Sequence, residues 1–193
     1  SAATILSKAD MIRYDRRNWS LHPTILGRVA SDYYVSHYSM RIYKDNMADH
    51  LSDTEIFRLF SLSGEFENIH VREEEKIELT KLLNQVPIPV KEGVDDHTAK
   101  INVLLQAYIS RLRLDGFAMM ADMTYIQQSA NRLMRALFTM ALKKGYASVA
   151  VRILNICKIV EGRLWESQSP LRQFKNIPDA IVRKLEKNSE VTW

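Results

Sequence analysis

The 193-residue sequence predicts an all-α protein, a helical bundle with a long central helix. After Thr24, apolar residues recur every three to four positions, which is the spacing of one helix face. Only 6 glycines and 5 prolines interrupt the chain, and hydrophobic residues, at 46%, are sufficient for a core. We therefore expect at least two-thirds of the chain to be helical, with no sheet beyond a hairpin near residues 12–21.

Residues 1–23 differ from the rest. A short helical stretch, Ala2–Ala9, precedes two short predicted strands, Met11–Asp15 and Trp19–His22, around the basic turn Arg16–Asn18. A helix followed by a β-ribbon is how a winged-helix domain ends, so we interpret residues 1–23 as the C-terminal remnant of such a domain. Because a lone hairpin is too small to be stable, we expect it to pack on the bundle.

Helix boundaries can be placed from capping signals. Thr24 can cap a helix that continues to Val35, Ser52 with Glu55 has the spacing of a capping box, and Gly145 can close the long helix. Further helices are expected at about 40–47, 71–83, 98–112, 117–120, 124–144, 148–166 and 178–187.

Composition narrows the classes of function. The net charge of +4 and pI near 9.1 are mildly basic and compatible with a nucleic-acid partner. Cys157 is the single cysteine, which excludes an internal disulfide and a cysteine-based zinc site. The five histidines are far apart, and no apolar run reaches the roughly 20 residues of a membrane helix. We expect no metal site and no membrane segment.

Catalytic motifs are also missing from the sequence. It contains no glycine-rich loop ending in Gly-Lys-Ser/Thr, no Gly-x-Ser-x-Gly elbow and no Cys/His pair. The acidic triplet Glu73–Glu75 could suggest a metal or acid–base cluster. Adjacent helical residues point in different directions, so we interpret it as a solvated group that complements the helix dipole. No catalytic residue and no cofactor are predicted within this chain.

The predicted long helix has two unlike faces. Counted at about 100° per residue, one face gathers Ile126, Ala130, Leu133, Leu137 and Ala141. The other gathers Tyr125, Gln128, Arg132, Arg135 and Thr139. Guanidinium, amide and phenol groups suit a single-stranded nucleic acid, although an ordinary solvated face has similar residues. Between Met123 and Tyr146 no acidic residue occurs, which favours binding.

Several strings resemble the family of large DExH-box helicases that contain a module homologous to part of the Sec-sixty-three protein. The resemblance covers nearly the whole chain in one register. It rests on 26–31 (LGRVAS), 71–76 (VREEEK), 86–91 (VPIPVK), 100–107 (KINVLLQA), 120–123 (MADM), 128–136 (QSANRLMRA) and 169–174 (SPLRQF).

The resemblance implies a domain order of two RecA-like motors, a winged helix, a helical bundle and a helix-loop-helix. It assigns 24–168 to the bundle and 169–193 to the start of the helix-loop-helix. ATP and magnesium would belong to the motor domains, outside this chain. The parent protein would then be the enzyme, an ATP-dependent RNA helicase, while the segment itself is non-catalytic.

In this family the long helix is called the ratchet helix and crosses the exit of the strand. Residues 125–136 match it, which implies RNA contacts for Gln128, Ser129, Arg132 and Arg135, in addition to Tyr125. We expect Arg132 to emerge into the groove and to contribute little to stability. Asn131 stands where relatives often have glycine.

Within the family the strings favour the N-terminal cassette of the spliceosomal branch, which implies a nuclear protein that holds snRNA while a duplex is unwound during pre-mRNA splicing. The implied partners are single-stranded RNA, the helicase's RecA-like domains and spliceosomal proteins. The branch of the activating-signal-cointegrator complex is an alternative parent. A protein-docking platform, for example on the face of residues 71–83, is an alternative function.

Overall fold

The computed structural model describes residues 2–174 and 176–187. The structure is 63% helical, slightly less than the two-thirds expected. In the described part, the strands are the two of one antiparallel hairpin, as predicted. The elements are α1 (Ala2–Lys8), β1 (Ile12–Asp15), β2 (Ser20–Pro23), α2 (Ile25–Asp32), α3 (His37–Asn46), α4 (Asp53–Ser61), η1 (Gly64–Phe66), η2 (Glu73–Glu75), α5 (Lys76–Leu83), α6 (His97–Ile109), α7 (Phe117–Lys144), α8 (Ala147–Gly162), η3 (Pro170–Gln173) and α9 (Asp179–Lys187).

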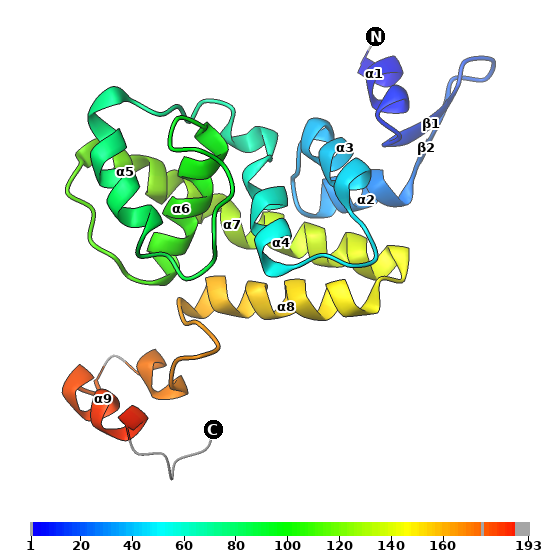
Figure 1. Cartoon of the computed structure of the whole chain (residues 1–193). Helices are drawn as coiled ribbons and strands as arrows, with labels where there is room; N and C mark the ends of the chain where they lie inside the picture. Colours follow the sequence, from blue (N-terminus) through cyan, green and yellow to red (C-terminus); the bar gives the residue numbers. More distant parts are fainter. Residues whose placement is uncertain (1, 175, 188–193) are drawn as a thin grey trace.

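The N-terminal segment is fastened to the bundle at the start of α2, while the hairpin tip projects from it (Figure 1). The Thr24 hydroxyl donates to the carbonyl of Asp10 at 2.6 Å and accepts from the backbone N–H of Gly27. Met11 is buried, and its carbonyl lies so close to Gly27 that a Cβ there would meet it at 1.9 Å. Glycine is therefore required at this crossing, and the segment packs on the bundle as expected.

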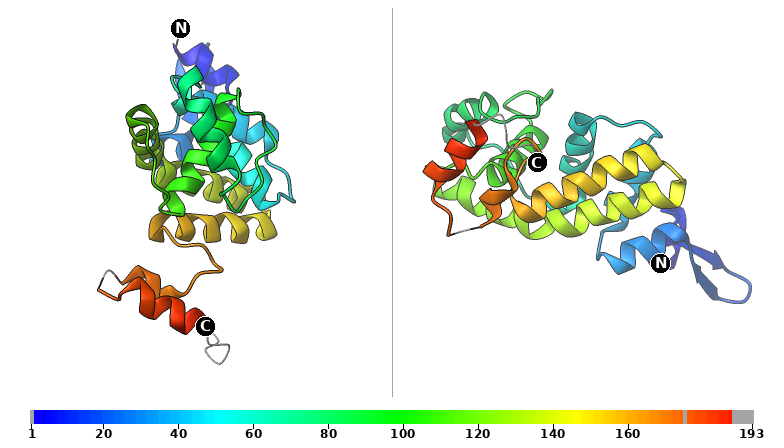
Figure 2. Two further views of the ribbon diagram at one scale, coloured as in Figure 1. Left: turned by 60° about the vertical axis from the view of Figure 1, so that its left-hand side comes forward. Right: turned by 90° about the horizontal axis from the view of Figure 1, so that it is seen from below.

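The bundle is built around three helices. Seen from below, α7 and α8 run side by side in opposite directions (right panel of Figure 2), joined at Gly145. Helix α6 crosses them, and α2 lies on another side of α7. Gly145 closes α7 at a φ of 77°, a left-handed conformation that glycine adopts without strain. The closing glycine was predicted, but the separate helix at 117–120 was wrong, because α7 continues through it.

Helix α6 differs from its predicted one-sided apolar stripe, since it is buried on nearly every side. Its polar residues are consequently in the interior. Gln106 holds the loop at Ile88, accepting from its N–H at 2.9 Å and donating to its carbonyl at 3.0 Å. Periodicity alone indicates a buried face but not how many neighbours a helix has.

Beyond α8 the chain turns away from the bundle, and α9 packs on η3 below α8 in the view of Figure 1. The boundaries proposed at residues 23/24 and 168/169 stay predictions. The last six residues of the predicted helix-loop-helix, 188–193, lie outside the described residues.

Candidate nucleic-acid interface

The candidate interface is carried by α7, which is held firmly at its start. The carboxylate of Glu78, on α5, accepts from the backbone N–H of Asp115 at 2.7 Å and of Gly116 at 3.2 Å. These donors precede the first turn, where a negative charge also complements the helix dipole. The position of α7 is thus fixed by a neighbouring helix before its exposed residues begin.

Helix α7 buries a wider face than was predicted. The five apolar residues expected in the core are all buried, and so are Ser129, Met134, Ala136 and Met140. Neighbours on several sides explain the difference, because α2, α6 and α8 all pack on α7. Part of the face expected to be polar is therefore covered by protein.

Ser129 and Arg132 lie in this covered part. Ser129 is 7% exposed, and its hydroxyl accepts from Arg132 Nη2 at 3.2 Å. Arg132 is half-buried, and its Nη1 donates to the carbonyls of Tyr33 and Tyr34, just after α2. Contrary to expectation, this guanidinium does not emerge freely but binds the carboxyl end of a neighbouring helix. A contact of either residue with RNA stays a prediction.

Tyr125 also makes contacts within the protein, but it is less buried than Ser129 and Arg132. Its hydroxyl donates to the carbonyl of Glu65 at 3.0 Å, and its ring lies edge-on to Phe66 with centroids 6.4 Å apart. The residue keeps 46% of its surface exposed. One side of the phenol thus remains open beside α7.

The side chains that face solvent form a line that we call the outer ridge: Thr124, Gln128, Asn131 and Arg135. Their spacings of four, three and four residues place them along one side of a helix. All four are exposed. Arg135 pairs with Glu161 of α8 at 2.9 Å, with both side chains more than half exposed. Such an exposed pair contributes little to stability, so the guanidinium can exchange Glu161 for another anion.

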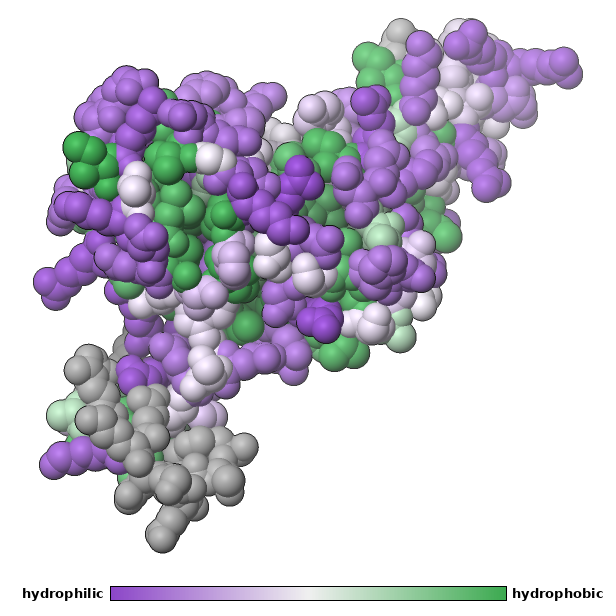
Figure 3. Space-filling view, in the orientation of Figure 1, coloured by the Kyte–Doolittle hydropathy of each residue, from purple (hydrophilic) through white to green (hydrophobic). Residues whose placement is uncertain are grey.

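Thr124 and Asn131 were missed as candidates because the predicted stripe was centred closer to Arg132. These two residues could have been found only by knowing which side of α7 is covered by protein. That side depends on where α2 packs, which the sequence does not show. Gln128 and Arg135 belong to both the predicted stripe and the observed ridge. On the face drawn in Figure 3, hydrophilic groups cover most of the surface and hydrophobic groups show in separate areas.

A buried ionic network lies near the start of α7. Lys100 is fully buried, and its Nζ donates to Glu75 Oε2 and Asp122 Oδ2 at 2.6 Å each and to the carbonyl of His70 at 2.8 Å. Arg72 Nη1 contacts the same carboxylates at 2.5 and 3.1 Å. Two cations and two carboxylates therefore compensate one another and join α6, η2 and α7.

Glu75 corrects the interpretation of the acidic triplet as a solvated group, since it is only 5% exposed. Burial by itself would raise the pKa of Glu75, but hydrogen bonds from Lys100 and Arg72 outweigh it and hold the pKa below the ordinary value of 4.5. The carboxylate is thus kept ionised in the interior.

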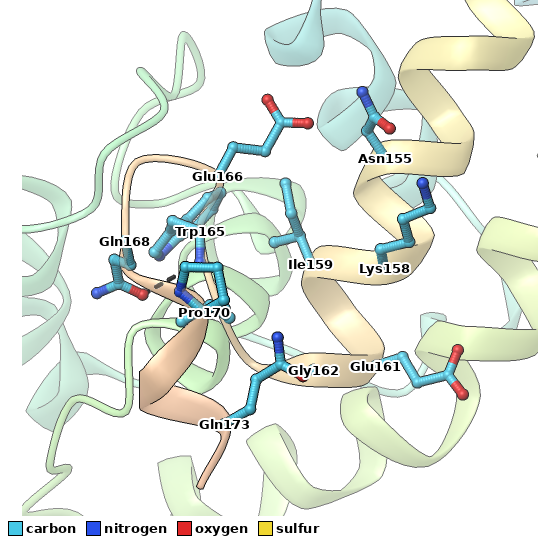
Figure 4. A pocket seen from close by; sticks show the side chains of 11 residues that line it. Asn155, Lys158, Ile159, Glu161, Gly162, Trp165, Glu166, Gln168, Pro170 and Gln173 are labelled. Atoms are coloured by element: carbon cyan, nitrogen blue, oxygen red, sulfur yellow. Dashed lines mark hydrogen bonds between the residues drawn. The ribbon is translucent and has the colours of Figure 1, made fainter. Parts of the chain in front are cut away.

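Two pockets near the end of α8 are not suited to binding an RNA strand. One, of about 520 Å³, is lined by Lys158 together with Glu161 and Glu166 (Figure 4), so negative charge prevails in it. Another, of about 260 Å³, is lined by arginines. There Arg163 Nε donates to the carbonyl of Tyr108 at 3.0 Å and Arg111 contacts the carbonyl of Arg172 at 3.4 Å. We interpret these as contacts that stabilise the ends of α6 and α8.

Among residues 2–174 and 176–187, no three His, Cys, Asp or Glu residues come together in a way that could hold a metal ion. In the same residues, no helix combines the length and the apolar character of a membrane span.

Comparison with protein families matches residues 23–191 to the Sec63 Brl domain. The chain belongs to this family. The match covers most of the sequence, including α7 and its outer ridge, and confirms the resemblance noted from the sequence strings.

Individual relatives are similar in sequence to this chain over nearly all of its length. The "U5 small nuclear ribonucleoprotein 200 kDa helicase" of Drosophila melanogaster is 53% identical over 187 residues, 97% of this chain and 9% of the relative. The "Pre-mRNA-splicing factor brr2" of Schizosaccharomyces pombe is 53% identical over 193 residues, which are 100% of this chain and 9% of the relative. The "Activating signal cointegrator 1 complex subunit 3-like" protein of Dictyostelium discoideum is 54% identical over 187 residues, which are 97% of this chain and 8% of the relative.

This Sec63 Brl chain therefore spans about a tenth of the length of these relatives. Their names represent both branches considered from the sequence, the spliceosomal helicases and the cointegrator-complex subunit.

Proposed function

We propose that this chain is the accessory RNA-guiding module of an ATP-dependent spliceosomal RNA helicase, which holds the translocated single strand while an snRNA duplex is unwound in the nucleus. The observation that carries the proposal is the outer ridge, an exposed polar line on the central helix of a chain half identical to helicases. RecA-like motors elsewhere in the parent protein would bind ATP and magnesium and hydrolyse the nucleotide.

The chemistry of the ridge fits a single strand. Arg135 can bind a phosphate, and the amides of Gln128 and Asn131 can donate to and accept from base edges. Residues 123–146 contain no carboxylate, so the helix itself does not repel a phosphodiester chain. Glu161 is the acidic group that pairs with Arg135 across the two helices, and an incoming phosphate would have to displace it.

The test compares two arginines in similar settings. Arg135 on α7 and Arg152 on α8 are 53% and 55% exposed, and each forms one exposed ion pair. We expect Arg135→Gln to weaken binding of an oligouridylate and to flatten its salt dependence by roughly 0.7 in log–log slope, the value for one lost phosphate contact on a single strand. Arg152→Gln, with the same change in net charge, should leave both nearly unchanged.

Fluorescence anisotropy of a labelled oligouridylate, titrated at several salt concentrations, measures both quantities. Equal effects of the two substitutions would mean that only net charge attracts RNA, and the ridge would lose its assignment.

A protein-docking platform is the second candidate function. It is favoured by Ile77 on α5 and Phe117 at the start of α7, which are 73% and 82% exposed. In the view of Figure 3, hydrophobic groups over the α5 region alternate with hydrophilic ones. A partner bound through apolar contacts would resist added salt, whereas RNA would dissociate.

A further inference from the structure

Tyr34, in the connection between α2 and α3, has an unusual backbone and an unusual exposure. Its φ is +52°, a left-handed conformation that is rare and strained for a bulky residue. Its surface is 86% exposed, the highest exposure of any large apolar or aromatic residue in the described part of the chain. The fold therefore keeps an aromatic ring in water at a position that glycine would occupy without strain.

The neighbours of Tyr34 explain how this conformation is maintained. Before it, the Tyr33 hydroxyl is hydrogen-bonded to Thr139 of α7 at 2.9 Å. After it, Val35 is buried, and its N–H donates to the carbonyl of Ala30 at 2.9 Å. With both neighbours directed inward, the intervening side chain is directed outward.

The connection is also fastened to α7. The carbonyl of Tyr34 accepts from the Arg132 guanidinium, so the exposed ring projects from a point in contact with this helix. Arg132 follows Gln128 by one helical turn, about 6 Å along the axis. On the surface of α7, Arg132 is thus a near neighbour of the ridge residues Gln128 and Arg135. The ring of Tyr34 projects from the connection whose backbone Arg132 binds.

We propose that Tyr34 stacks on an unpaired base of the single strand that follows the outer ridge. Stacking needs only the flat face of the ring and one exposed side, and it tolerates any base. The inference rests on the proposed RNA-guiding function and adds to it a residue outside α7. Arg132 would then act as a positioning residue, because it holds the backbone of Tyr34 rather than the RNA.

The surroundings favour a base over a protein partner. Two acidic groups belong to this part of the chain: Asp32, which is exposed two residues before Tyr34, and Glu65, which accepts from the N–H of Ser36 at 2.8 Å and also binds Ser39. These charges would repel a phosphate, so the expected contact is with the base and not with the backbone. The flanking residues Asp32 and Ser36 are exposed and polar, unlike the apolar patch that usually marks a protein contact.

The strained backbone allows a substitution that separates folding from binding. Tyr34→Gly removes the ring and relieves the strain, so the melting temperature of the complete chain should stay the same or rise. Oligoribonucleotide affinity should fall roughly 5- to 150-fold, the range for one lost aromatic stack. Tyr34→Phe should retain the affinity, because the ring plane is kept. Tyr38→Ala, at an exposed tyrosine on α3, is the matched control.

A strand containing 2-aminopurine provides a readout of stacking itself. Its fluorescence should be quenched on binding to the wild type and to Tyr34→Phe, and should recover with Tyr34→Gly. If Arg135→Gln weakens binding but Tyr34→Gly changes neither affinity nor quenching, the stacking role is overturned while the ridge survives, and the ring would instead be a protein contact. If the wild-type chain binds no strand at all, the proposed function itself fails.

Discussion

The start and the middle of α7 use positive charge in opposite ways. Near the start, Lys100 is entirely buried and shared between Glu75 and Asp122 at 2.6 Å. In the middle, Arg135 is half exposed and has one exposed carboxylate partner. A buried cation needs fixed partners because desolvation is costly, whereas an exposed one can exchange partners. The difference teaches that the first region positions the helix and the second is free to bind a ligand.

The largest effect is expected from breaking the buried network. Lys100→Met leaves Glu75 and Asp122 in the interior with only Arg72 to compensate them. Removing one partner of a buried ion pair typically costs about 3–5 kcal/mol, so the free energy of unfolding should fall by about that amount. Urea unfolding measures it. The double variant Lys100→Met with Glu75→Gln should recover part of the loss, and no recovery would show that the two residues are not coupled.

A pH series tests the same network by neutralising the charge of Glu75 without changing the volume of its side chain. Because the pKa of Glu75 is lowered in the folded chain, its contribution is complete above the ordinary value of 4.5 and is lost as the pH falls through the lower, folded value. Wild type should therefore be more stable than Glu75→Gln at pH 7, and the gap should narrow below pH 4.5. A gap that stays constant down to pH 3 would contradict the assignment.

Arg132 lies between the two extremes, and its substitution sharpens the comparison. Arg132→Leu should lower the free energy of unfolding by about 1–2 kcal/mol, somewhat below the typical value for charged hydrogen bonds because the side chain is half exposed. Arg135→Leu should change it by about 0.5 kcal/mol or less. Urea unfolding of both variants checks this order. Equal values would restore the original expectation that Arg132 is a free surface residue.

The sequence predicts the apolar phase of α7 well because periodicity reports directly on the buried side. It does not reveal that Arg132 binds the carbonyls just after α2, since that contact joins residues about 100 positions apart. The network at Lys100 is hidden for the same reason, as its carboxylates are 25 and 22 residues away. Local signals, such as Ser52 with Glu55 and the glycine at 145, are confirmed because capping involves only near neighbours.

The candidate site is predicted in part. Gln128 and Arg135 are exposed as expected, whereas Thr124 and Asn131 emerge only once the neighbours of α7 are known. Tyr34 could not have been found from spacing, because its exposure follows from a backbone conformation that the string Asp-Tyr-Tyr-Val does not indicate.

The attachments at the two ends of α7 have a mechanical consequence. Glu78 holds the two residues that precede α7, and at the other end Lys144 Nζ donates to the carbonyls of Lys44 and Met47 at 3.1 and 3.4 Å. The 28 residues of α7 form a rod about 42 Å long that is fastened near both ends and supported along its length by α6 and α8. The middle of this rod falls between residues 130 and 131. Arg132 adds a contact with the end of α2 close to this point, so a strand pulling on the ridge would load the whole bundle rather than bend α7.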